Sequence, residues 1–146
     1  MRKRVRVARA VSVPMLINRG LQNDELEMRD RMLVEAFAGG WAGPAHFDNL
    51  ADMRDCLMLA AADRDDQAVL ALCRAAAVAL QNIRVRQGET GRFGASGEEL
   101  KALRSFVEVY RDFWLRQPVS LYVAACDAMD RARAAGLYSV NVAVQR

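Results

Sequence analysis

Residue types that perform acid–base chemistry are sparse in this sequence. His46 is the only histidine, and it precedes Asp48 by two positions. A histidine near a carboxylate can act as a general base. No serine or cysteine lies close to His46 in the sequence to serve as its nucleophile. We therefore expect His46 to be a surface or capping residue, and we predict no catalytic residue in this chain.

Three aspartates recur along one predicted helix face, at positions 48, 52 and 55, with Arg54 and Arg64 nearby. Clustered carboxylates can bind a metal ion or transfer protons. The ordinary alternative is a solvated helix face whose charges contribute little. We favour the solvated face, and the sequence predicts neither a metal site nor a cofactor.

Cysteine usage also argues against a metal centre. Cys56, Cys73 and Cys126 are far apart in the sequence, and each lies in an apolar helical context. There is no Cys-x-x-Cys pair, and structural zinc sites need clustered ligands. An odd number of cysteines does not suit an oxidised framework. We predict three buried thiols that pack as small hydrophobic residues.

A glycine-rich loop is predicted at residues 87–96, beside Arg84, Arg86 and Arg92. Glycine amides and arginines together can bind phosphate. The segment lacks the Lys-Ser/Thr that ends a P-loop and the preceding strand of a dinucleotide-binding fold. A flexible connection between helices is therefore the favoured interpretation, with the arginines as candidate contacts to a partner.

Two aromatic residues are further candidates for partner binding. Trp41 follows two glycines in a short connector, and Phe93 lies within the glycine-rich loop. Exposed tryptophans often anchor partner proteins, although a tryptophan that closes a core is more common. The sequence leaves both interpretations open for each residue.

The first nine residues carry five positive charges and no acid, while the rest of the chain sums to −2. Residues 1–4 are expected to form a flexible basic arm. An arm of this kind binds nucleic acid through phosphates, without sequence preference and with strong salt dependence. The residues that would make this contact are Arg2, Lys3, Arg4 and Arg6.

Both ends of the chain have the alternating apolar pattern of a strand. Valines occupy every second position over most of residues 5–13, and the pattern returns at residues 137–144. Two strands alone are marginally stable, so the ends are expected to pair with each other or with those of a second copy. Pairing between chains would make a homodimer.

The rest of the chain has helical periodicity. Ser96 and Glu99 form a capping-box pattern ahead of an apolar run. Five helices are predicted, near residues 23–38, 44–62, 67–86, 97–117 and 119–135. The fold class is therefore mainly α: one domain over residues 1–146, with about five helices in an orthogonal-type bundle and short strand-like ends.

No apolar run approaches the length of a membrane span, and the start of the chain is a poor match to a secretion signal. We expect a cytoplasmic protein with no membrane partner. The helices also lack the tight turn and polar recognition helix of a helix-turn-helix DNA reader.

Residues 13–60, and more loosely residues 82–104, resemble a group of short uncharacterised proteins from phages, prophages and plasmids of G+C-rich proteobacteria. The resemblance implies an accessory protein of a mobile element and transfers no catalytic residue. Small phage proteins of this kind often bind and redirect a host machine.

The sequence thus predicts a non-enzymatic, dimeric accessory protein that binds a host or phage protein. The candidate contacts are Trp41, Phe93, Arg84, Arg86 and Arg92. A nucleic-acid-associated factor that uses the basic arm is the alternative, and an enzyme of unknown class is the least favoured.

Overall fold

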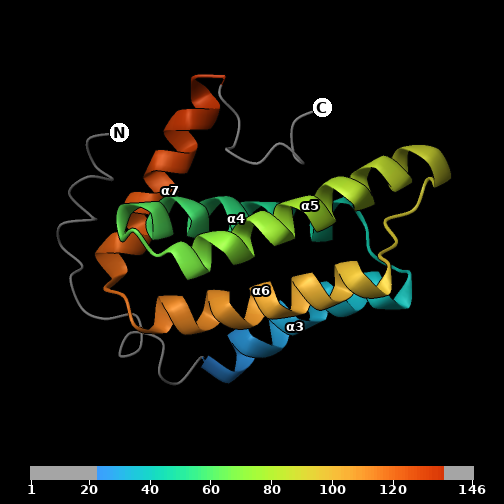
Figure 1. Ribbon diagram of the computed structural model, residues 1–146, viewed down its shortest axis with the longest axis horizontal. Helices are drawn as coiled ribbons and strands as arrows, with labels where there is room; N and C mark the ends of the chain where they lie inside the picture. Colours follow the sequence, from blue (N-terminus) through green and yellow to red (C-terminus); the bar gives the residue numbers. More distant parts are fainter. Residues whose placement is uncertain (1–22, 137–146) are drawn as a thin grey trace.

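The structure, a computed structural model, describes residues 23–136. Within this range the chain forms five α-helices and no strand, which confirms the predicted mainly α fold (Figure 1). The helices are α3 (Asn23–Gly39), α4 (Pro44–Asp63), α5 (Gln67–Thr90), α6 (Gly97–Leu115) and α7 (Val119–Ala134). The predicted strands at 5–13 and 137–144, and the basic arm at 1–4, lie outside the described residues.

Four of the helices run along the long axis of the molecule, and α7 rises steeply across one end (Figure 1). Helix α5 packs against α4 on one side and α6 on the other. Helix α3 packs mainly on α6, and α7 packs mainly on α4. Helices α3 and α7 lie on the outside of the bundle. Each therefore buries one face and leaves the opposite face available to solvent.

The core is built from apolar residues at helical spacing, mostly on α4, α5 and α6, with further residues from α3 and α7. Leu57, Leu80, Ile83 and Leu103 have no exposed surface. Burying one such side chain contributes on the order of 2 kcal/mol to folding. The amphipathic stripes that identified the helices in the sequence are thus the surfaces that hold them together.

A glycine ends α3. Gly40 takes a left-handed conformation (φ 79°), which glycine adopts without steric cost. The Trp41 amide then donates to the Ala36 carbonyl at 3.0 Å, and the Gly40 amide donates to the Phe37 carbonyl. This Schellman arrangement satisfies the terminal carbonyls and fixes where Trp41 leaves the helix.

The turn between α4 and α5 uses two aspartates. Asp65 is left-handed (φ 54°) and closes α4, and the Asp66 carboxylate caps α5 by accepting from the Val69 amide at 3.1 Å. The Ser96–Glu99 capping box of α6 is also present. These caps confirm the predicted starts of both helices.

The predicted loop boundary at residue 87 is wrong, because α5 continues to Thr90. Gly88 lies inside the helix, where glycine costs roughly 1 kcal/mol relative to alanine. The Thr90 hydroxyl donates to the Arg86 carbonyl at 2.9 Å, and Gly91 (φ 78°) supplies the left-handed end. The connection to α6 is therefore only residues 91–96.

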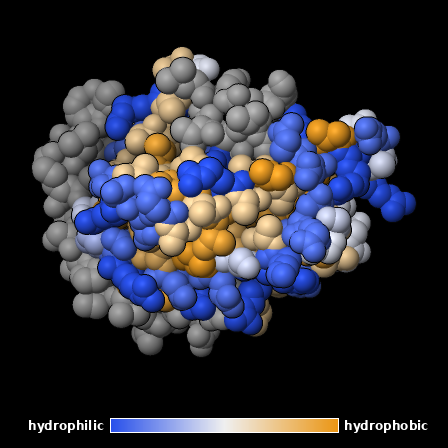
Figure 2. All heavy atoms as spheres, viewed as in Figure 1, coloured by the Kyte–Doolittle hydropathy of each residue, from blue (hydrophilic) through white to orange (hydrophobic). Residues whose placement is uncertain are grey.

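By length and composition alone, α5 is apolar enough to cross a membrane. One face of α5 is buried in the bundle, and this buried share is 33% of the apolar window. Val78 and Val85 lie on its outer face and are more than half exposed. Apolar side chains gather across the middle of the viewed face, with polar ones around them (Figure 2).

Candidate functional site

The α5–α6 junction, which we define as Arg84, Arg86, Phe93 and Glu99, is held by internal contacts. The Arg86 guanidinium donates two hydrogen bonds to the Glu99 carboxylate, each of 2.9 Å, and a third to the Gly94 carbonyl. Paired hydrogen bonds between these groups are among the stronger polar contacts. The Glu99 carboxylate also accepts from the Ser96 amide, so one acid both caps α6 and joins it to α5.

This contact shifts the ionisation of both groups. The hydrogen bonds from Arg86 lower the pKa of the Glu99 carboxyl, and burial opposes the shift. The same contact raises the pKa of Arg86. Both charged forms are therefore favoured by folding.

The aromatic residue of the junction packs inward. The Phe93 ring lies 5.6 Å from the Phe47 ring, centroid to centroid, and Phe93 is half-buried against the core. The Arg84 guanidinium lies 6.0 Å from the same Phe47 ring, at the outer limit of a cation–π contact. Phe47 thus receives contacts from two of the predicted partner-binding residues, Phe93 and Arg84.

Of the five predicted partner-binding residues, the structure therefore engages Phe93, Arg84 and Arg86 within the chain. Arg92 is exposed at the connection between α5 and α6. Trp41 lies elsewhere, in the connector between α3 and α4, and the structure does not bring it together with the junction. Partner binding by these residues stays a prediction, and Trp41 is the one whose surroundings favour it most.

Three large apolar side chains are exposed together where α3 meets α4. Met28, Met32 and Trp41 are 64%, 52% and 56% exposed. With Arg29, Leu33 and His46 they line one surface hollow of about 440 Å³. We call Met28, Met32, Trp41 and His46 the corner patch. Methionine and aromatic residues are enriched in protein interfaces, and grouped exposed apolar residues mark such surfaces.

The indole of Trp41 is held in place by its neighbours. A Cβ atom at Gly39 would lie 2.6 Å from the indole Nε1, so only glycine leaves room for this ring. The His46 ring meets the indole edge to face, with centroids 5.4 Å apart. His46 Nδ1 accepts from the Gly43 amide at 3.0 Å, which confirms the predicted capping role.

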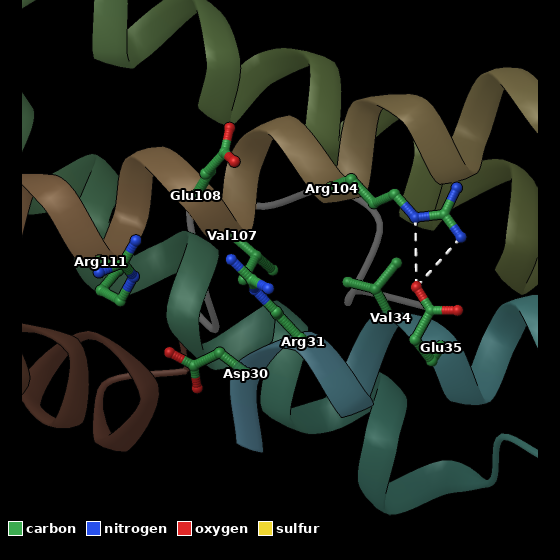
Figure 3. A pocket seen from close by; sticks show the side chains of 8 residues that line it. All are labelled: Asp30, Arg31, Val34, Glu35, Arg104, Val107, Glu108 and Arg111. Atoms are coloured by element: carbon green, nitrogen blue, oxygen red, sulfur yellow. Dashed lines mark hydrogen bonds and ion pairs between the residues drawn. The ribbon is translucent and has the colours of Figure 1, made fainter. Parts of the chain in front are cut away.

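A second hollow, of about 400 Å³, lies between α3 and α6 (Figure 3). Its charged lining consists of three arginines and three acids, over an apolar floor of Val34 and Val107. The charged residues are Asp30, Arg31, Glu35, Arg104, Glu108 and Arg111. Arg104 donates to one Glu35 oxygen through two nitrogens, at 3.1 and 3.3 Å. Because the charges balance, this groove offers no net attraction for a phosphate group.

The predicted solvated acidic face of α4 holds for Asp48, which is exposed, and is wrong for Asp55. Arg54 and Asp55 are each 1% exposed and form an ion pair. Arg133 of α7 donates to Asp55 at 3.1 Å and pairs with Asp52 at 2.8 Å. Burial lowers the pKa of Arg54, opposed by the Asp55 charge. Asp55 is buried because α7 covers this flank of α4, whereas the Asp52 side chain stays 47% exposed, and together the two acids join α4 to α7 through Arg133.

Cys56 and Cys73 are buried, as predicted, and Cys126 is half-buried. No local pattern in the sequence indicates that two of them meet. The sulfur atoms of Cys56 and Cys126 lie 3.7 Å apart, on α4 and α7. Among residues 23–136, no group of three potential metal ligands is present.

Comparison with family models, with curated proteins and with solved structures gave no match. The function of this chain must therefore be inferred from its own geometry.

The exposed methionines were missed by sequence reasoning. Met28 and Met32 are four residues apart, and so share a face that excludes the buried Leu33 and Phe37. The sequence signal for this patch was the pair Met28 and Met32 on the solvent side of an amphipathic helix.

Proposed function

We propose that this chain is a non-enzymatic binding protein that docks a partner protein on its corner patch. The observation that carries the proposal is the grouping of Met28, Met32 and Trp41 around one hollow while all three remain more than half exposed. A lone exposed apolar residue is ordinary, but several around one concavity are not. Trp41 is also pre-positioned by Gly39 and His46, which lowers the entropic cost of binding.

The polar groups of the hollow indicate the chemistry of the occupant. Arg29 lines the hollow, and its side chain is 67% exposed even with Asp30 nearby. In neutral His46, Nδ1 accepts a hydrogen bond, so the ring proton lies on Nε2 and can be donated. The hollow thus combines an apolar surface with a cation and a donor. It suits a segment that presents a large apolar side chain beside a carboxylate.

The resemblance to proteins of mobile elements makes a host or phage protein the expected source of that segment. Homodimerisation and a cytoplasmic location stay part of this proposal. The nucleic-acid alternative receives no support from Arg84 and Arg86. Arg86 is hydrogen-bonded to Glu99, and Arg84 lies over the Phe47 ring. This alternative would depend on Arg92 and on residues 1–9.

The test is selection of binding peptides from a random display library on the immobilised full-length chain. We expect enriched peptides to carry a large apolar residue next to Asp or Glu. Their affinity should fall roughly tenfold or more in Trp41→Ala, as for an interface hot spot. The matched control is Val78→Ser, which removes an equally exposed apolar side chain from α5 and should leave affinity unchanged.

Three outcomes would contradict the proposal. Enriched peptides could bind Trp41→Ala and the wild type equally. The chain could form a dimer that Trp41→Ala dissociates, which would make a second copy the occupant. Random-sequence DNA could bind with a steep salt dependence that is lost on deleting residues 2–4 and neutralising Arg6, which would favour the nucleic-acid function.

A further inference from the structure

Cys56 and Cys126 face each other across the contact between α4 and α7. Their sulfur atoms are 3.7 Å apart, although 70 positions separate the two residues in the sequence. Cys56 is 3% exposed, whereas Cys126 is half-buried and so partly open to solvent. The ion pairs from Arg133 to Asp52 and Asp55 hold the same two helices together. The two sulfurs are therefore kept close by the packing of the fold.

The two thiols have different environments. A hydrogen bond from the Cys56 thiol, with a further one from Tyr122, lowers the pKa of Cys126 against the opposing effect of burial. The hydrogen bond to Cys126 and burial raise the pKa of Cys56. A thiolate is the nucleophile in disulfide exchange. Cys126, which is the more accessible, is thus also the better attacking group.

We infer that Cys56 and Cys126 are a redox-active pair that closes reversibly into an intramolecular disulfide when a small-molecule disulfide oxidises the protein. The Cys126 thiolate attacks one sulfur of glutathione disulfide, forms a mixed disulfide and releases glutathione thiolate. Cys56 then attacks the Cys126 sulfur and expels the second glutathione. The Cys56 proton passes to the departing thiolate. The protein loses two electrons and two protons, and glutathione disulfide is reduced to two glutathione molecules.

Closure would fasten α7 to α4 by a covalent bond. Helix α7 packs mainly on α4, so the bond would fix its main contact with the rest of the fold. Cross-links between residues distant in the sequence restrict the unfolded chain strongly. We therefore expect oxidation to stabilise the fold and to leave the corner patch, on the α3 side, unaltered.

The experiment treats the full-length native protein with glutathione disulfide and measures intact mass and non-reduced peptide maps. The expected product has lost two hydrogen atoms and links the peptides containing Cys56 and Cys126. Its thermal midpoint should rise by about 10 °C and return to the starting value when a thiol reductant is added.

Cys73 supplies the matched control, because burial raises its pKa to about 12 and it should not react. Cys73→Ser should close at the wild-type rate, and Cys56→Ser should stop at a glutathione adduct on Cys126. The inference is overturned by a stable glutathione adduct on Cys126 in the wild type, by a bridge to Cys73, or by a dimer linked through Cys126. The wild-type peptide map decides the question even if a variant does not fold.

Discussion

The α5–α6 junction and the corner patch both contain residue types that anchor partner proteins, and they use them differently. At the junction, Arg86 is bound by Glu99 and Phe93 packs on Phe47. At the corner, Met28 and Trp41 project into solvent around a hollow. The comparison shows that residue type is a weak guide to binding. The two regions differ in whether contacts within the fold already occupy these side chains.

The largest expected effect is at the junction. Glu99→Ala removes the partner of Arg86 and the acid of the capping box together, so it should lower the free energy of unfolding by about 3 kcal/mol. Denaturant titration measures this. Glu98→Ala, one residue earlier and exposed, should change stability by less than about 0.5 kcal/mol. Equal effects at the two positions would show that the junction is not held as described.

Acid should weaken the junction more than the corner. The pKa of Glu99 is lower in the folded chain because Arg86 donates to its carboxylate. Its contribution to stability is therefore complete above the unfolded pKa of about 4.3, and it is lost as the pH falls through the lower folded value. Unfolding measured between neutral pH and acid should show a steeper loss in the wild type than in Glu99→Gln. Identical slopes would contradict this role.

The smallest expected effect on stability is at the corner. Gly39→Ala places a Cβ atom against the Trp41 indole and should move the ring, with a stability change of less than about 0.5 kcal/mol because the site is exposed. Acrylamide quenching in a Trp114→Phe background isolates Trp41, since the chain has two tryptophans. The Gly39→Ala substitution should alter this quenching. Gly97→Ala, whose Cβ meets nothing, is the control and should not.

Much of the fold followed from the sequence, because helix stripes and caps are local. Asp66 and the Ser96–Glu99 box mark helix starts through contacts within three residues. The sequence places the end of α5 too early, because glycine usually interrupts a helix. In the structure, helical turns on both sides of Gly88 keep it within α5.

The sites were less predictable, because they depend on contacts between distant residues. Arg86 meets Glu99 only when α5 and α6 pack, and Cys56 meets Cys126 only when α7 covers α4. The exposure of Trp41 depends on the packing of α3 against α4. Local patterns specify none of these contacts.

We propose that the corner patch binds a partner while the α5–α6 junction holds the fold. The direct test measures both unfolding free energy and affinity for a selected apolar–acidic peptide in Trp41→Ala and Phe93→Ala. Trp41→Ala should lose roughly tenfold or more in affinity with stability unchanged, and Phe93→Ala should lose about 2 kcal/mol of stability with affinity unchanged. The reverse pattern, or loss of both properties in both variants, would contradict the account.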